Sequence, residues 1–340
     1  MHSERRPRLT PAIADVRRAV RTALTALPSS SAPEPLVLVA LSGGPDSLAL
    51  AAATAFEASK AGMRAGAVIV DHNLQDGSAD VAAAAAQQAR DLGLDPVDIR
   101  TVHVGDAGGP ESAARDVRYA ALAEAAAEHG AIRVLLGHTL DDQAETVLLG
   151  LARGSGAGRL KGMAADTGAS LRPLLAVPRS TTVQFCADSG IVAWNDPHNL
   201  DTSYTRVRVR QTVLPMLESE LGPGIRDALA RTADQAREDS EALDHFAEEM
   251  AEDLADMSEA GISLPVGALA ANPAALRQRL IRLAVFSEFH VSLSRTHTLE
   301  IARLVTDWRG QGPIDVPGVR VERRENLLHF SAHSEERDAV

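Results

Sequence analysis

The sequence predicts an α/β protein whose first domain is a doubly wound, mostly parallel sheet and whose second, smaller domain is mainly helical. Apolar runs of strand length alternate with alanine-rich helical stretches in the first half of the chain, which is the pattern of a parallel sheet. The runs are continuously apolar, as in strands that are buried on both faces. A chain of 340 residues is also long for a single domain.

The elements of the first domain follow from these patterns. The expected strands cover residues 36–41, 65–70, 97–104 and 132–137, with an edge strand in 170–180. The expected helices cover residues 11–28, 47–60, 78–92, 111–129 and 141–152, and a glycine-rich loop covers 154–168. Ligands of such sheets bind at the carboxyl ends of the strands, so the loops that follow the strands are the expected place of a site.

The second domain has a different texture. Residues 205–220, 224–257 and 272–289 have helical patterns, and residues 312–330 read as two short strands. Residues 216–260 contain fourteen Asp or Glu against three Arg, whereas residues 150–215 contain eight Arg or Lys against four Asp or Glu. The boundary is therefore expected near residue 215, giving domains 1–215 and 216–340, and the net charge of −12 hides a basic stretch.

Cysteine content and hydropathy restrict the protein class. The single cysteine, Cys186, excludes an intrachain disulfide or a CxxC centre and is expected to be a buried apolar side chain. No apolar run approaches the roughly 20 residues that cross a bilayer. The N-terminus has no apolar segment of the kind that a signal peptide contains. We therefore expect a cytoplasmic protein without a membrane partner.

The stretch SGGPDS, Ser42–Ser47, lies where the first expected strand ends and a helix begins. Free backbone N–H groups and the helix dipole make such a place an anion site. Gly43 and Gly44 allow close approach of the backbone, and the two serine hydroxyls can donate hydrogen bonds. Asp46 would repel a phosphate unless a cation such as Mg²⁺ lies between them. The alternative is that Asp46 or Ser47 is simply the helix N-cap.

This stretch resembles the PP-loop of the ATP pyrophosphatase superfamily, while the Walker pattern is absent and no dinucleotide fingerprint follows this strand. Five further stretches are VDHNLQDGS, ESAARDVRY, GHTLDDQAETVLLGLARGSG, RPLL and WNDPHNLDTSYTRVRVRQTVLP. Together they resemble the tRNA(Ile)-lysidine synthetase family over residues 36–216, with a looser fit beyond. The resemblance implies an ATP-dependent ligase that joins free L-lysine to C2 of the wobble cytidine in the CAU anticodon of tRNA(Ile).

Acidic residues at the start of the 141–152 helix can be read in two ways. Asp141 and Asp142 each share a helix face with Glu145, and such acids could hold a lysine ammonium group or a metal. Equally, acids in a first turn stabilise the helix dipole, and Thr139 with Asp142 resembles a capping box. The resemblance favours Asp142 and Glu145 as residues that serve lysine or Mg²⁺, one of them as a base or an orienting group.

The resemblance also implies roles for the nucleotide site. Arg115 would contact the ATP phosphates, whereas Arg118 alone would be read as an ordinary solvated arginine. The expected catalytic residues are Asp46, Asp142, Glu145 and Arg115, with Asp46 on Mg²⁺. The expected nucleotide-binding residues are Ser42, Gly43, Gly44, Pro45, Asp46, Ser47, Asp71, His72 and His138.

The basic stretch is expected to bind the tRNA backbone in a salt-sensitive manner. Its expected tRNA-binding residues are Arg153, Arg159, Lys161, Arg206, Arg208 and Arg210. The last three alternate, which would place them on one face of a strand but spread them around a helix. Gln75, His198 and Val207 depart from the family pattern, which leaves the tRNA contacts at these positions open.

Two alternatives to this reading remain. The first is an ammonia-dependent PP-loop synthetase that acts on a small molecule, and a test of dependence on free lysine separates it from the lysine ligase. The second is a nucleotide-binding sensor that binds ATP without releasing pyrophosphate. PP-loop enzymes that thiolate tRNA use paired cysteines, which this chain lacks. The oligomeric state is left open, with a homodimer among the alternatives.

Overall fold

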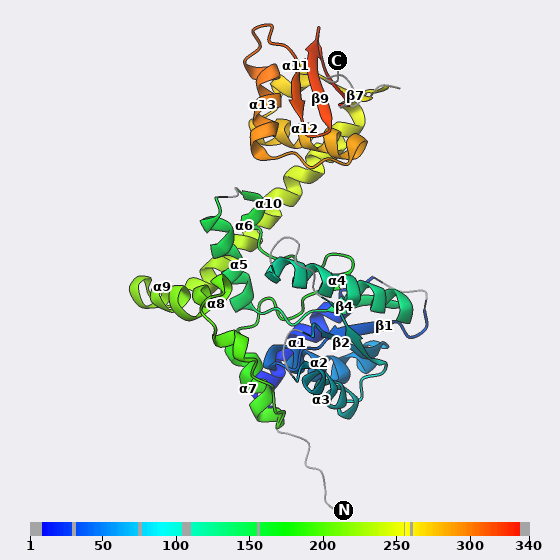
Figure 1. Ribbon diagram of the computed structural model, residues 1–340, viewed down its shortest axis with the longest axis vertical. Helices are drawn as coiled ribbons and strands as arrows, with labels where there is room; N and C mark the ends of the chain where they lie inside the picture. The colour runs from blue at the N-terminus through cyan, green and yellow to red at the C-terminus, as the bar shows by residue number, and fades with distance from the viewer. Residues whose placement is uncertain are drawn as a thin grey trace, which may run out of the picture. The chain divides into compact units, whose positions relative to one another are not determined.

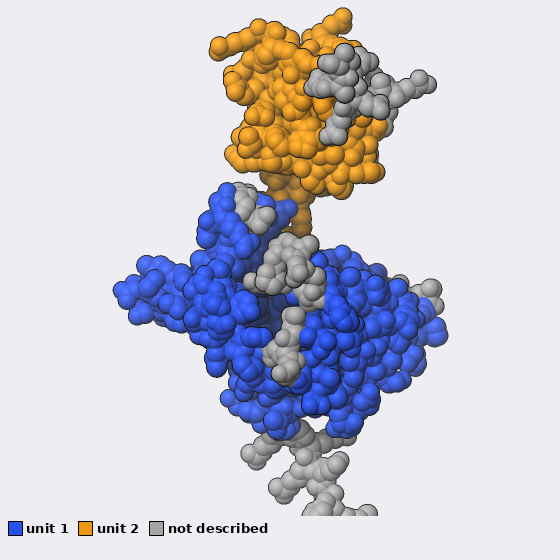
Figure 2. Space-filling model, viewed as in Figure 1, with its two compact units in different colours: residues 1–235 blue, residues 236–340 orange. Residues whose placement is uncertain are grey.

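The computed structural model describes residues 9–28, 32–73, 77–103, 110–154, 157–254, 256–258 and 261–333. The chain forms two compact units, residues 1–235 and 236–340 (Figure 2). The division lies within helix α10 (Ile225–Leu254), beyond the boundary near residue 215 that the sequence suggested. A local apolar cluster explains the difference, because Leu214 and Leu229 pack with Ala144 of the first unit.

The first unit contains a five-stranded sheet in which all strands are parallel (Figure 1). Its spatial order is β3-β2-β1-β4-β5. The strands are β1 (Leu36–Ala40), β2 (Arg64–Asp71), β3 (Val97–Thr101), β4 (Ala131–Leu135) and β5 (Ser170–Leu171). The predicted doubly wound sheet is thus confirmed, although the edge strand is only two residues long.

Helices cover both faces of this sheet. Along β1, Leu36 and Leu38 join the apolar cluster beneath α4 (Pro110–His129), while Val37 and Val39 join the cluster formed with the helices of the other face. This alternation accounts for the continuous apolar run, because each side of the strand is buried. Figure 1 shows α4 on one side and α1–α3 on the other. The helices of this second face are α1 (Pro11–Thr25), α2 (Pro45–Ala58), α3 (Ser78–Asp91) and α7 (Arg179–Ser189).

The strand order creates a switch point between β1 and β4. The chain leaves β1 toward β2 and β3, then returns to pair β4 with the free side of β1. In open α/β sheets, ligands bind in the crevice at the carboxyl ends of the two strands where the order reverses. The loops at 42–47 and 137–139 meet there. A Cβ atom on Gly137 would lie 3.2 Å from backbone atoms of Asp46 and Ser47, so glycine permits this close approach.

The segment after β4 is helical and closes the first unit. Its helices are α5 (Leu140–Ala152), α6 (Ala157–Leu160), α7, the 3-10 helix η2 (Pro197–Leu200), α8 (Thr205–Arg208), the π-helical turn η3 (Val209–Val213) and α9 (Leu214–Leu221). A further 3-10 helix, η1 (Ser59–Ala61), directly follows α2. The alternating arginines therefore lie on a helix and not on a strand.

The second unit combines the end of α10 with an antiparallel sheet in the order β6-β7-β10-β9-β8. Its elements are β6 (Asp256–Ser258), β7 (Gly261–Pro265), α11 (Val266–Ala271), α12 (Ala274–Phe289), α13 (Arg295–Thr306), β8 (Ile314–Val316), β9 (Val319–Arg324) and β10 (Leu327–Ala332). The tail holds three strands and not two, because Gly318, at φ +75°, turns the chain between Val316 and Val319. Among the described residues, no helix is long and apolar enough to span a membrane.

Candidate active site

The loop after β1 leaves the first turn of α2 without a side-chain cap. Gly44 is the N-cap residue, and it has no side chain that could accept from the first N–H groups. Neither Asp46 nor Ser47 takes that role, so the N-cap alternative is wrong. Gly43 has a φ of +80°, which favours glycine, and its carbonyl accepts from Trp194 N at 2.9 Å. The backbone donors of this turn are suited to an anion.

The two serines of the loop differ in exposure. Ser47 is buried, and its Oγ donates to Gly44 O at 3.0 Å and accepts from Ser42 N at 3.2 Å. Its hydroxyl therefore holds the shape of the loop. Ser42 is exposed, with its Oγ 3.2 Å from that of Ser47, so it is the serine that can reach a bound molecule.

Asp46 is held by two residues of α7. Its Oδ2 lies 3.0 Å from Arg179 Nε, and its Oδ1 accepts from the Thr182 hydroxyl. Burial raises the pKa of the Asp46 carboxyl, and the nearby Arg179 charge opposes this only in part. The carboxylate is consequently fixed at the edge of the loop and paired with a guanidinium group.

Arg179 links the loop Ser42–Ser47 to the acids of α5, and sequence reasoning missed it. Besides Asp46, its guanidinium group lies 2.8 Å from Asp142 Oδ1 and 3.6 Å from Glu145 Oε1. Its backbone N–H donates to Asp141 Oδ2 at 2.8 Å. Although burial lowers the pKa of Arg179, the carboxylates of Asp142, Asp46 and Glu145 raise it overall. In the sequence, Arg179 was only one of the arginines of the basic stretch.

Asp142 serves two partners at the start of α5. Its Oδ2 accepts from the backbone N–H and the hydroxyl of Thr139, each at 2.8 Å, which confirms the capping box. Burial opposes ionisation of Asp142, but the Arg179 charge and the Thr139 N–H outweigh it and lower the pKa to about 2. The group is therefore a permanent carboxylate at neutral pH.

Glu145 is completely buried among arginines of the helical segment that begins at Thr205. Arg210 Nε lies 2.7 Å from its Oε1, and Arg206 Nε lies 3.3 Å from its Oε2. Arg206 and Arg210 are four residues apart, so they share a helix face. Arg208 lies on another face, is exposed, and donates to the carbonyl of Thr202 at 2.8 Å. Two of the five arginines expected to bind tRNA thus contact an acid of the site.

The other residues that were expected to bind tRNA lie at the end of α5 and in the segment after it. Arg153 is exposed at the C-cap of α5, and Lys161 is half-buried. The side chain of Arg159 lies outside the described residues, as does Gln75. Of the two other departures from the family pattern, Val207 is buried and His198 is exposed, with its ring centroid 6.1 Å from that of Tyr204.

A second group of side chains is rich in unpaired nitrogen atoms. Among the described residues, no hydrogen-bond partner is found for four buried nitrogens, which are His72 Nδ1, His138 Nδ1, Arg118 Nε and Arg172 Nε. Burial, together with the nearby arginine charges, lowers the pKa of His138 to about 4 and lowers that of His72. Both rings are therefore neutral at pH 7, and the positive charge that could attract an anion belongs to Arg118 and Arg172.

Arg118 corrects the sequence interpretation. It was expected to be solvated, but it is only partly exposed, and burial lowers its pKa. Arg115, which was preferred for the ATP phosphates, is exposed, with its guanidinium carbon 5.1 Å from the centroid of the Tyr119 ring. On α4 the more enclosed arginine is thus Arg118.

Asp71 and Cys186 complete the set of predicted residues. Asp71, at the end of β2, is buried, and its Oδ1 accepts from Asn73 N at 2.9 Å, so one oxygen shapes the turn. Cys186 is buried as expected, and burial raises the pKa of its thiol to about 11. A thiol with this pKa is a poor nucleophile at neutral pH.

The site has groups that suit the phosphates of a nucleoside triphosphate, and a single carboxylate that suits its metal. The uncapped turn of α2 and the partnerless Nε atoms of Arg118 and Arg172 suit phosphate oxygens. Within the described ranges, no group of three or more His, Cys, Asp or Glu could hold a metal by itself. Mg²⁺ that is bound to a substrate phosphate needs only one or two protein carboxylates, and Asp46 fits this requirement.

Comparisons with known proteins agree with this arrangement. Residues 16–217 match the PP-loop domain, and residues 264–329 match the TilS substrate binding domain. The PP-loop match implies that the chain uses ATP. A solved structure of the U34-tRNA thiolase NcsA from Methanococcus maripaludis, with its [4Fe-4S] cluster, has a TM-score of 0.53 at 18% identity, over 66% of this chain and 78% of that chain. This likeness concerns the fold alone.

Curated relatives cover almost the whole chain. A tRNA(Ile)-lysidine synthase from Leifsonia xyli is 61% identical over 91% of this chain and 93% of its own length. Proteins of the same name from Thermobifida fusca and Streptomyces coelicolor are 52% and 53% identical, over 93% and 86% of this chain and 96% and 83% of their own lengths. With a PP-loop, an acid cluster facing it and this degree of identity, the chain belongs to the tRNA(Ile)-lysidine synthase family.

Proposed function

We propose that this chain is a carbon–nitrogen ligase that converts the wobble cytidine of a CAU-anticodon isoleucine tRNA into lysidine, using ATP and free L-lysine. The observation that carries the proposal is the identity of up to 61% with curated tRNA(Ile)-lysidine synthases over most of the chain. The meeting of the PP-loop with the acids of α5 at the switch point supports it. No other candidate function is favoured by a specific observation.

The loop Ser42–Ser47 and the cations of α4 are proposed to bind ATP. The first-turn N–H groups of α2 and the Ser42 hydroxyl would donate to phosphate oxygens. Arg118 would add a charge-assisted hydrogen bond from inside the site, and Arg115 another from its exposed side. Asp71, His72 and His138 are proposed to line the nucleoside. Mg²⁺ held by Asp46 would neutralise phosphate charge while the phosphate bond is broken.

The first chemical step is an adenylation. The C2 oxygen of cytidine attacks the α-phosphorus of ATP, and pyrophosphate leaves. The protein's part is to hold the two reactants in line, since positioning supplies much of the acceleration in phosphoryl transfer. The base must be unstacked to reach the crevice, which an anticodon loop permits.

The second step joins lysine to the activated base, with loss of AMP. Asp142 and Glu145 are proposed to bind the lysine ammonium group, for which they must exchange contacts with Arg179, Arg206 or Arg210. With a pKa of about 2, Asp142 is too weak a base to take the proton of the attacking amine efficiently. We therefore assign it an orienting role and not the role of the base.

The tRNA is proposed to lie along exposed basic residues of the first unit. Arg153 and Arg208 are exposed, and Arg159 and Lys161 belong to the same stretch of sequence. Arg206 and Arg210, which contact Glu145, would act at the site itself, so that tRNA docking and lysine binding share one helical segment. A salt-sensitive affinity for tRNA is expected from such contacts.

Incorporation of radiolabelled lysine into bulk tRNA, with and without ATP, tests the proposal. ATP-dependent label confined to a CAU-anticodon isoleucine tRNA is the expected result. Absence of label, together with pyrophosphate release when ammonia and a small acceptor are supplied, would replace this function by the ammonia-dependent alternative. A mutant tRNA with a GAU anticodon is the matched control and should remain unlabelled.

A further inference from the structure

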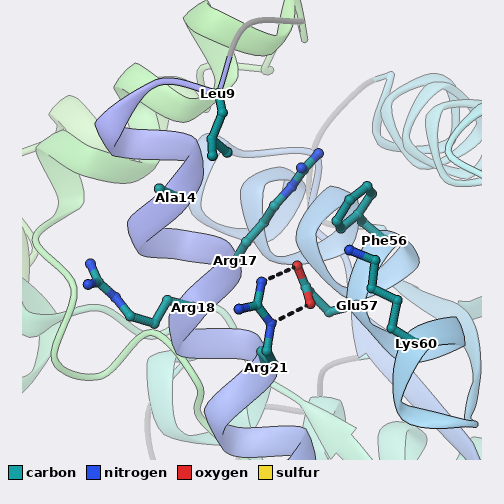
Figure 3. A pocket seen from close by; sticks show the side chains of 8 residues that line it. All are labelled: Leu9, Ala14, Arg17, Arg18, Arg21, Phe56, Glu57 and Lys60. Carbon is teal, nitrogen blue, oxygen red and sulfur yellow. Dashed lines mark hydrogen bonds and ion pairs between the residues drawn. The ribbon is translucent and has the colours of Figure 1, made fainter. Parts of the chain in front are cut away.

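A second basic site lies on the first unit, where α1 faces the end of α2 and η1. It is a pocket of about 380 Å³, lined by Arg17 and Arg21 of α1 and by Phe56, Glu57 and Lys60 of the second segment. Figure 3 shows Arg17 and Lys60 beside the Phe56 ring and Arg21 joined to Glu57. Phe56 stands eleven residues after Pro45, which is about 16 Å along a helix axis. The pocket is therefore separate from the PP-loop.

Two cations of this pocket share one aromatic ring. The guanidinium carbon of Arg17 lies 3.6 Å from the centroid of Phe56, and Lys60 Nζ lies 3.8 Å from the same centroid. A cation–π contact stabilises each cation, but holding two cations so close together costs electrostatic energy. Phe56 thus keeps two charges near one another that would otherwise separate.

The carboxylate of the pocket is already neutralised. Glu57 is almost completely buried, and both of its oxygens accept from Arg21, at 2.8 and 3.0 Å. Within the described part of the chain, Arg17 and Lys60 form no ion pair, and Arg17 Nε is buried without a hydrogen-bond partner. Burial and the neighbouring Arg21 lower the pKa of Arg17, whereas Glu57 raises it. Three cations against one carboxylate leave an excess of positive charge.

We propose that this pocket binds a phosphate group, with Arg17 and Lys60 as its ligands. Guanidinium and ammonium groups are the side chains that bind phosphate oxygens most strongly, and a doubly charged phosphate would balance the excess charge. The phosphate could belong to a small anion or to the backbone of the tRNA. The tRNA source rests on the proposed function, whereas the small anion does not.

The double variant Arg17→Gln/Lys60→Gln tests the pocket, and Arg64→Gln/Arg90→Gln, which removes two exposed charges of the same unit, is its matched control. Calorimetric titration with pyrophosphate measures the number of sites. If small anions use the pocket, the parent and the control bind two molecules and the pocket variant binds one, because the PP-loop remains intact.

Titration with tRNA at several salt concentrations forms the other arm. If the tRNA backbone uses the pocket, the pocket variant loses about 3–10-fold in affinity for tRNA. The slope of log affinity against log salt concentration also becomes less steep by about one or two relative to the control. Lysine incorporation at saturating tRNA should be unchanged in every variant, so a failure of the proposed function would appear in the parent itself. Equal pyrophosphate stoichiometry and equal salt slopes in the pocket variant and the control would overturn the proposal.

Discussion

The two sides of the candidate active site differ in whether their charged and polar groups have partners within the protein. On one side, which we call the paired cluster, Asp46, Asp142 and Glu145 each contact at least one guanidinium group from Arg179, Arg206 or Arg210. On the other side, His72, Arg118, His138 and Arg172 each have one buried nitrogen without a hydrogen-bond partner among the described residues, and we call them the unpaired cluster. Arg172 also donates from its other nitrogens to Ala164 O and to the Tyr119 hydroxyl. The carboxylates of one side are paired with arginines, whereas the other side keeps nitrogen atoms without a partner.

This difference indicates what each side does. Buried charges that are paired hold one another in place, and removing one partner leaves the other uncompensated. Buried donors without partners are costly, and such groups are retained where a ligand satisfies them. The paired cluster should therefore contribute to stability and geometry, whereas the unpaired cluster should contribute mainly to binding of an anion.

The largest effect is expected from Asp46→Asn, the member of the paired cluster that lies on the PP-loop. Asn keeps the size of the side chain but loses the charge that would hold Mg²⁺, so tRNA-dependent pyrophosphate release should fall by at least about 10²–10³-fold. The unfolding midpoint should fall less than in a variant that lacks Arg179, because Arg179 keeps Asp142 and Glu145 as partners when Asp46 loses its charge. Turnover near that of the parent would remove Asp46 from the mechanism.

Arg179→Met tests whether the paired cluster contributes more to the free energy of unfolding than the unpaired cluster does. The substitution leaves Asp46, Asp142 and Glu145 without their shared partner, and a loss of about 3 kcal/mol in the free energy of unfolding is expected. Arg118→Met, on the unpaired side, should cost far less. Urea unfolding of both variants measures the comparison, and equal losses would show that the clusters do not differ in this respect.

Much of the site was predictable because its residues follow strands in the sequence. The glycines of Ser42–Ser47 and the acids after β4 meet since parallel strands end at a common edge, and a sheet pattern suffices to infer that edge. The capping box of Thr139 and Asp142 is likewise a local pattern. Local spacing therefore predicted the positions of these groups.

What sequence reasoning missed depends on long-range packing. Arg179 reaches Asp46 over a separation of 133 residues, and no local pattern distinguishes it from other arginines of the basic stretch. The exposed Arg115 and the enclosed Arg118 lie three residues apart on α4, and their difference depends on which face of that helix meets the sheet. The pattern of residues 205–220 predicted a helix, which the structure shows, but it did not reveal that Arg206 and Arg210 contact Glu145.

Arg115 and Arg118 of α4 give a third prediction. Arg118→Met should raise the KM for ATP by about 10–100-fold, since a hydrogen bond to a charged group contributes about 1.5–3 kcal/mol. Arg115→Met, its neighbour on the exposed face, should raise this KM by a smaller factor because water screens its charge. Steady-state kinetics at saturating lysine and tRNA measure both, and a larger effect at Arg115 would restore the original ranking.

The smallest effect concerns pH and the neutral imidazole of the unpaired cluster. His138 has a pKa of about 4 in the folded chain, whereas an unfolded histidine titrates near pH 6.5. As the pH falls from about 6.5 to 4, the unfolded chain gains a proton that the folded chain does not, so the free energy of unfolding decreases. His138→Gln should make this decrease between pH 7 and pH 5 smaller by about 1–2 kcal/mol. The lowered pKa of His72 also decreases stability as the pH falls, whereas the raised pKa of Asp46 increases it. The measurement is therefore urea unfolding of variant and parent at pH 7 and pH 5, and the quantity compared is the change in the free energy of unfolding between these two pH values. An unchanged difference would mean that His138 takes up a proton in the folded state, and the unpaired cluster would then be more cationic at pH 5 than the geometry implies.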